Sequence, residues 1–132
     1  MILVHLIVVL ALIQFIVFGI LVGRARGQYG VKAPATTGHE IFERYYRVQM
    51  NTLELLILLL PAMWIALSYL SPAWISLAGA IYLVGRVVYL RAYVKDPSKR
   101  AFGFGLSIMP INALLIAILV GVGMHYFNGV PI

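Results

Sequence analysis

Four stretches of the sequence are each apolar enough and long enough to cross the hydrocarbon core of a membrane. They cover about residues 2–23, 40–70, 73–94 and 103–127, and a membrane-spanning helix needs about 20 mostly apolar residues. Hydrophobic residues make up 63% and charged residues 11% of the chain, against about 45–50% and about 25% in soluble domains. The sequence therefore predicts an all-α integral membrane protein, with a single domain over residues 1–132 that forms a four-transmembrane-helix bundle.

The positive charges predict how these helices are oriented. All ten Lys and Arg residues lie between Arg24 and Arg100. The connections at 24–41 and 95–102 are rich in them, whereas the 70–72 connection and both termini contain none. Because cytoplasmic loops of membrane proteins carry an excess of Lys and Arg, we expect the two basic connections in the cytoplasm and both termini on the opposite side. The net charge of +6 then reflects topology, and no nucleic-acid partner is expected.

Two of the predicted helices each carry a row of polar side chains. The row in the second helix is spaced by 4, 3, 4 and 3 residues and consists of Glu40, Arg44, Arg47, Asn51 and Glu54. The row in the third helix is spaced by 4, 3 and 4 residues and consists of Tyr82, Arg86, Tyr89 and Tyr93. These spacings place each row on one helical face. Polar groups at membrane depth are costly, so the two rows predict a polar seam between the helices.

The polar seam has two interpretations. Membrane bundles use buried polar side chains to join helices, so Glu54 could simply pair with Arg86. However, the seam holds more cations than anions, and the surplus faces the cytoplasmic side. Guanidinium groups form paired hydrogen bonds with carboxylates, and Asn and Tyr side chains add orienting hydrogen bonds. The second interpretation is therefore a binding site for a small polycarboxylate.

Other kinds of chemistry lack the residues they need. The chain contains no cysteine, so a thiol used in any reaction has to belong to a substrate. His5 and His125 lie near the non-cytoplasmic ends without an evident third ligand, and no metal site is expected. The glycine pairs near Gly103 and Gly121 follow no strand and lack the lysine of a phosphate-binding loop.

Two segments resemble a known family. Residues 42–54 resemble the second-helix motif of the MAPEG superfamily, the membrane-associated proteins in eicosanoid and glutathione metabolism. The motif has an Arg, a Gln or His, an Asn and a Glu at the intervals of Arg47, Gln49, Asn51 and Glu54. Residues 85–93 and 97–100 are similar to the third-helix region of its type-three microsomal glutathione transferases and leukotriene synthase.

The resemblance implies a homotrimer of four-helix subunits that binds glutathione, without a metal, between neighbouring subunits on the cytoplasmic side. Arg100 would be the catalytic residue, because a cation beside the sulfur lowers the pKa of the thiol and favours the nucleophilic thiolate. Gln49 would reach across the subunit interface, and Arg26 in the first loop would hold a carboxylate of glutathione. The remaining expected glutathione-binding residues are Arg47, Asn51, Glu54, Arg86, Tyr89 and Tyr93.

The predicted function is a glutathione transferase or peroxidase that acts in detoxification on hydrophobic electrophiles or lipid hydroperoxides, which enter from the bilayer. A thiol-dependent isomerase is a variant of the same function. One alternative is a non-catalytic lipid-binding or scaffold member of the superfamily, which would lack the thiol-activating Arg and the glutathione ligands. Another is a small four-helix membrane exporter. An exporter would be expected to carry a carboxylate in the middle of the first helix, where this chain has Gln14.

Overall fold

The computed structural model describes residues 1–129, which form four long α-helices and one turn of 3-10 helix. The elements are α1 (Ile2–Gln28), α2 (Glu40–Ala66), α3 (Pro72–Lys95), η1 (Pro97–Lys99) and α4 (Ala101–Asn128). All four α-helices are long and apolar enough to span a membrane. The prediction of an all-α, multi-pass integral membrane protein is confirmed.

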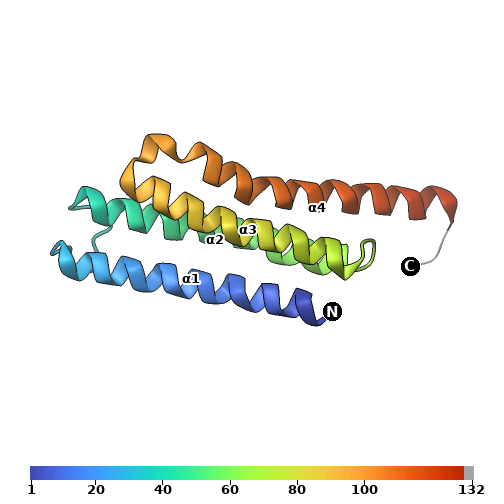
Figure 1. The fold of residues 1–132 in the computed structure, drawn as a ribbon, viewed down its shortest axis with the longest axis horizontal. Coiled ribbons are helices and arrows are strands. Elements are labelled where there is room, and N and C mark those ends of the chain that lie inside the picture. Colours follow the sequence, from blue (N-terminus) through green and yellow to red (C-terminus); the bar gives the residue numbers. More distant parts are fainter. Residues whose placement is uncertain (130–132) are drawn as a thin grey trace.

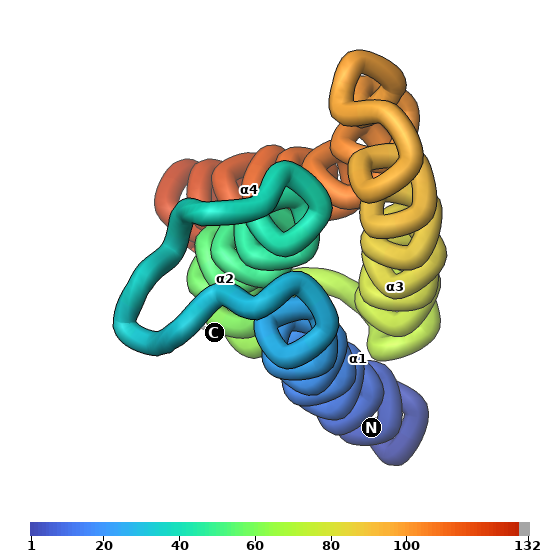
Figure 2. Tube along the Cα trace, turned by 90° about the vertical axis from the view of Figure 1, so that its left-hand side faces the viewer, coloured from blue at the N-terminus to red at the C-terminus, as the bar shows by residue number. Residues whose placement is uncertain are grey.

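The two basic connections lie at the same end of the bundle (Figure 1). The α1–α2 connection and η1 are at one end, whereas the N-terminus, the α2–α3 turn and the end of α4 are at the other. Viewed from the end with the basic connections, α4 begins beside the end of α3 and then runs across towards α2 (Figure 2). The charged ends of α2, α3 and α4 are therefore brought together.

Local signals in the sequence set two of the helix starts. His39 caps α2, since its Nδ1 accepts a hydrogen bond of 3.1 Å from the Ile41 N–H. Glu40 and Glu43 lie in the first turn, where negative charge is favourable beside the free N–H groups of a helix. Pro72 begins α3, a position at which proline costs no helical hydrogen bond.

Two predicted helix ends are wrong. α1 continues to Gln28 instead of ending near residue 23, so Arg24 and Arg26 lie on the helix and not in the loop. The extra turn is helical because Val22 and Ala25 stay buried in an apolar cluster with the α1–α2 connection and the start of α2. α2 ends at Ala66 and not at residue 70, and the residues that follow form turns.

The outer faces of the bundle are apolar. Leu59, Ile75 and Ile111 are fully buried in the core between the helices. By contrast, α1 and α4 expose many large aliphatic side chains, among them Ile20 and Leu119. Lipid tails are as apolar as these side chains, so hydrocarbon can cover them at no cost. The arrangement suits a chain whose outer helices face lipid.

Two glycines lie where α3 and α4 pack closely together. A Cβ on Gly103 would lie 2.5 Å from the backbone nitrogen of Tyr89, and a Cβ on Gly85 would lie 2.8 Å from the backbone of Leu106 and Ser107. Backbone atoms cannot rotate away from such overlaps, and small residues are what allow membrane helices to approach this closely. The distance between Tyr89 and α4 therefore depends on glycine at position 103.

We predict that Gly103→Ala lowers the thermal stability of the protein, because the added methyl group overlaps the backbone of Tyr89. Overpacking of this kind costs about 1–3 kcal/mol. Gly105→Ala is the matched control, since its Cβ would meet no described atom within 4 Å and alanine favours the helix by roughly 1 kcal/mol. Thermal unfolding of the purified variants in detergent measures the difference. Equal melting temperatures would contradict the close contact.

Candidate functional site

The structure contains a polar pocket at the end of the bundle that carries the basic connections. Its volume is about 900 Å³. Six of the predicted site residues line it, and the full lining consists of Arg47, Asn51, Glu54, Tyr89, Tyr93, Ser98, Arg100, Ala101 and Phe104. The pocket thus collects side chains from α2, α3, η1 and α4 that are far apart in the sequence.

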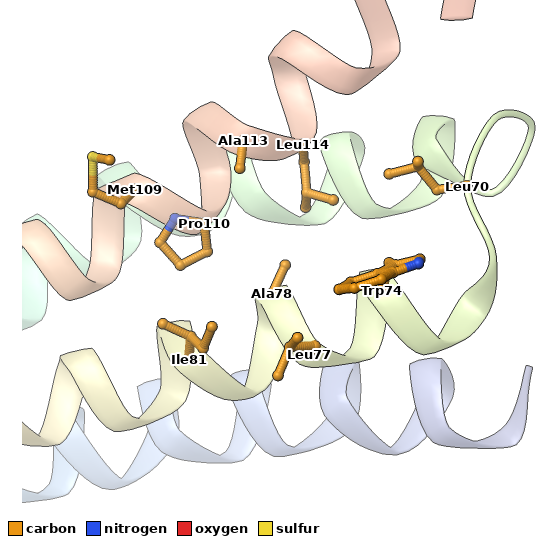
Figure 3. A pocket seen from close by; sticks show the side chains of 9 residues that line it. All are labelled: Leu70, Trp74, Leu77, Ala78, Ile81, Met109, Pro110, Ala113 and Leu114. Atoms are coloured by element: carbon orange, nitrogen blue, oxygen red, sulfur yellow. The ribbon is translucent and has the colours of Figure 1, made fainter.

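A second cavity, the apolar groove, has no comparable chemistry. It lies between α3 and α4 and has a volume of about 570 Å³. In Figure 3, side chains from α3 and α4 face each other across it, with Leu70 and Trp74 at one end. Its other lining residues are Leu77, Ala78, Ile81, Met109, Pro110, Ala113 and Leu114. Such a surface can hold hydrocarbon but cannot orient a polar substrate, so the polar pocket is the candidate site.

α2 contributes an ion pair to the polar pocket. Arg47 Nη1 donates to Glu54 Oε1 at 2.9 Å, and the two side chains are 50% and 55% exposed. Glu54 therefore pairs with Arg47, and the interpretation in which it neutralises Arg86 is wrong. Exposed pairs contribute little to stability. The pair instead leaves the remaining nitrogens of Arg47 free of protein partners within residues 1–129.

Arg86 lies behind the wall of the polar pocket and is fully buried. Its Nη1 donates to Asn51 Oδ1 at 2.7 Å and to Thr52 Oγ1 at 3.3 Å, and its Nε donates to Ser107 Oγ at 2.9 Å. The guanidinium carbon is 4.3 Å from the centre of the Tyr89 ring, within the range of a cation–π interaction. Arg86 was expected among the ligand-binding residues, but it does not line the pocket. It contacts Asn51 and Tyr89, which do.

Two tyrosines of α3 form the opposite wall. The ring centroids of Tyr89 and Tyr93 are 5.4 Å apart, and the Tyr89 ring is 6.4 Å from that of Phe104. Neither hydroxyl has a hydrogen-bond partner within residues 1–129, and neither is sealed from the pocket. Both hydroxyls can therefore donate to a bound ligand.

The turn that carries Arg100 is fixed by Asp96. Its Oδ1 accepts from the Ser98 N–H at 3.1 Å and from the Ser98 hydroxyl at 2.8 Å, while Arg100 Nη1 donates to Pro97 O at 3.0 Å. The hydrogen bonds from Ser98 hold the pKa of the Asp96 carboxyl below its ordinary value, because they stabilise the charged form. Asp96 is therefore a charged cap at neutral pH.

Arg44 ties the same turn to α2. Its Nη1 donates to the backbone carbonyls of Val94 at 2.9 Å and Lys95 at 3.2 Å, the last residues of α3. Its Nη2 pairs with Glu40 one helical turn away. Arg44 was predicted in the polar row of α2, and the structure gives it a partner at the end of α3.

Arg26 and Gln49 lie away from the polar pocket, on the α1 side of α2. Arg26 donates to Ala35 O at 2.7 Å and its guanidinium carbon is 4.7 Å from the centre of the Phe42 ring. Its local effect is to brace the α1–α2 connection. Gln49 packs against α1, since its Nε2 would lie 2.9 Å from a Cβ placed on Gly19. One chain alone does not bring these two residues to the pocket.

Sequence reasoning overlooked several residues around the site. Ser98 and Phe104 line the polar pocket, and Thr52 and Ser107 accept hydrogen bonds from Arg86. A signal existed for Ser107, which is a polar residue deep in a very apolar helix and so calls for a buried partner. Nothing in the sequence distinguished Phe104 from the other apolar residues of α4.

Known proteins resemble this chain along most of its length. Residues 4–120 match the model of the MAPEG family. An uncharacterized protein of Synechocystis sp. is 43% identical over 117 residues, which cover 89% of this chain and 85% of that protein. Microsomal glutathione S-transferase 2 of Mus musculus is 33% identical over 107 residues, covering 81% and 73% of the two chains. Leukotriene C4 synthase of Cavia porcellus is 33% identical over 109 residues, covering 83% and 73%.

We predict that Asp96→Ala loosens the turn that carries Arg100, because it removes the acceptor of both Ser98 hydrogen bonds. Hydrogen-exchange mass spectrometry should show faster exchange at residues 97–100, and Lys99→Ala, which leaves the cap intact, should not. The pKa of Asp96 is lowered by folding, so the cap stabilises the folded state at neutral pH and is lost as the pH falls through that lowered pKa. Unchanged exchange in Asp96→Ala at neutral pH would contradict this role.

Proposed function

The chain belongs to the MAPEG family, and we propose that it is a membrane glutathione transferase. It would conjugate hydrophobic electrophiles with the thiolate of glutathione, or reduce lipid hydroperoxides with it. Relatives over most of the chain are named glutathione S-transferases and leukotriene C4 synthases. The observation that carries the proposal is the polar pocket, in which cations and hydrogen-bond donors outnumber the single carboxylate.

The pocket complements the charges of glutathione. At neutral pH the tripeptide has two carboxylates, one ammonium group and a thiol. Arg47 and Arg100 offer guanidinium groups, which bind carboxylates with paired, charge-assisted hydrogen bonds. Glu54 offers the one carboxylate suited to an ammonium group. Tyr89 and Tyr93 add hydroxyl donors, so the ligand's charged ends and its amides all have a partner of the right kind.

We also propose that the site is shared between copies of the chain in a homotrimer. Arg47 and Glu54 are about half exposed, although they lie on a helix able to span a membrane. Charged side chains facing lipid cost roughly 2.5–3.5 kcal/mol each on insertion scales. A second copy covering this face would remove that cost. Its Arg26 and Gln49, which lie away from their own chain's pocket, would then be available to the neighbouring one.

Arg100 would activate the thiol. A free thiol is mostly protonated at neutral pH, and the thiolate is the nucleophile. A guanidinium group stays protonated and cannot act as a base, so Arg100 would act by stabilising the thiolate while the proton leaves to water. Its place on the turn after η1, at the rim of the pocket, leaves the sulfur open to a second substrate.

The second substrate would be hydrophobic and reach the site from the bilayer. The exposed faces of α1 and α4 are apolar, and Ala101 and Phe104 at the start of α4 line the polar pocket beside Arg100. A molecule dissolved in lipid can therefore approach the cation along α4. The proposed active site would lie at the cytoplasmic end of the bundle, where water-soluble glutathione is present.

We predict that Arg100→Ala lowers turnover by roughly 10²–10³-fold, the usual effect of removing one group that stabilises developing charge, and lowers glutathione affinity much less. Arg100→Lys should recover part of the rate, because it keeps the charge and loses the planar fork. The assays are glutathione binding, the thiolate absorbance of bound glutathione, and turnover with a chlorinated aromatic and a lipid hydroperoxide.

The matched control is Lys99→Ala, which removes a neighbouring exposed cation that does not line the pocket. It should leave thiolate absorbance and turnover close to those of the parent. Unchanged thiolate absorbance and turnover in Arg100→Ala would show that Arg100 is a topology signal only. A parent protein that neither binds glutathione nor turns over either substrate would favour the scaffold alternative.

We predict that the basic connections are cytoplasmic and both termini are not. The chain contains no cysteine, so single cysteines report their own positions. Ala35→Cys and Lys99→Cys should react with a membrane-impermeant maleimide only after the cells are permeabilised. Ser71→Cys, in the turn at the other end of the bundle, should react in intact cells. Efficient labelling of Ala35→Cys in intact cells would overturn the orientation.

A further inference from the structure

Arg86 decides which end of the Asn51 amide faces the polar pocket. A guanidinium group has only donors, so the Asn51 atom that lies 2.7 Å from Arg86 Nη1 has to be the amide oxygen. The amide nitrogen then has no hydrogen-bond partner within residues 1–129, and it is not sealed from solvent. Because Asn51 lines the pocket, its two N–H groups are directed into it.

Two hydroxyl groups beside Arg86 accept hydrogen bonds from its Nε and Nη1, while its Nη2 has no partner within residues 1–129. The Thr52 hydroxyl donates its proton to Val48 O at 2.8 Å, and the Ser107 hydroxyl donates to Gly103 O at 2.7 Å. With their protons used, both hydroxyls can only accept from Arg86. The guanidinium plane is further fixed by the Tyr89 ring at 4.3 Å. Acceptors on α2 and α4 and one aromatic ring therefore hold Arg86 as a rigid donor.

We propose that Arg86 is a positioning residue that makes Asn51 an obligatory hydrogen-bond donor to the ligand. Without Arg86 the amide could rotate and present its oxygen to the pocket instead. With Arg86 in place, position 51 accepts only a carboxylate or carbonyl oxygen and rejects an N–H group. The inference rests on the proposed function for the identity of that ligand, which is glutathione.

If Arg86 had a purely structural role, replacing it would affect protein stability without a specific link to Asn51. Its hydrogen bonds join three helices, so losing them would lower stability whatever Asn51 does. A positioning role adds two consequences. First, Arg86 affects ligand affinity only through Asn51. Second, a side chain at position 51 that accepts a hydrogen bond from Arg86 but offers no N–H group to the pocket binds the ligand more weakly.

Asn51→Asp tests the second consequence. Aspartate has the same shape, pairs with the unneutralised charge of Arg86, and offers only acceptors to the pocket. Its melting temperature should rise, while its affinity for glutathione should fall by roughly 5- to 150-fold, the equivalent of one lost buried hydrogen bond. Affinity equal to that of the parent would show that the amide direction is wrong.

A double-mutant cycle tests the first consequence. Arg86→Met removes the donors, and Arg86→Lys keeps a single cationic donor nitrogen. Glutathione affinity is measured for each variant in the parent and in Asn51→Ala. Arg86→Met should weaken binding in the parent, have a smaller effect in Asn51→Ala, and be partly rescued by lysine. Arg91→Met, on the exposed side of the same helix, is the control and should bind as the parent does.

The outcomes separate the two proposals. If the parent does not bind glutathione, the proposed function fails and this inference fails with it. If the parent binds and Arg86→Met weakens binding equally in both backgrounds, the proposed function stands and Arg86 does not act through Asn51. If Arg86→Met does not fold, Asn51→Asp, which keeps Arg86, still decides the question by its affinity.

Discussion

The bundle is organised around one buried guanidinium group that has no carboxylate partner within residues 1–129. Arg86 on α3 reaches acceptors on α2 and on α4, so three helices meet at one charge. An unneutralised charge inside a membrane bundle is expensive, and hydrogen bonds to its donors reduce that cost. Nη1 and Nε of Arg86 have such partners, whereas Nη2 has none within residues 1–129. The hydrogen bond from Nε to Ser107 requires α4 to lie close to α3, as Gly85 and Gly103 allow. The glycines and the arginine therefore depend on each other.

This cluster divides the polar face of α2 into two parts. Asn51 turns inward to Arg86 and is almost fully buried, whereas Arg47 and Glu54 remain about half exposed. The helical spacing puts these residues on one face of α2. That face forms a pocket wall in which Asn51 is held by Arg86, while Arg47 and Glu54 are open to solvent. A ligand in the polar pocket would meet the Asn51 amide on one side and the exposed charges of Arg47 and Glu54 on the other. Fixed donors give orientation, and exposed charges attract an ionic ligand.

The sequence predicted the helices from their apolar length and the polar rows from the spacing of their residues. Apolar length marked the membrane-spanning helices, and the spacing of Arg47, Asn51 and Glu54 placed them on one face. Periodicity could not say that Arg86 would choose Asn51 and Ser107 over Glu54, since that depends on how α4 crosses α3. It also could not place Arg26 on a helix, because the last turn of α1 is held by contacts with α2 that lie outside its own pattern.

Arg86 and Arg100 differ in burial, and the difference decides what each could do in the proposed enzyme. Arg86 is fully buried and its charge is committed to the protein, so it can only hold other groups in place. Arg100 is exposed, and in water its field on a nearby sulfur is strongly screened. Thiol activation in the proposed enzyme therefore needs water to be excluded from around Arg100. A neighbouring copy of the chain and a hydrophobic substrate on α4 would both exclude water from around Arg100. Assembly and substrate binding would therefore each favour the thiolate form of glutathione over the thiol.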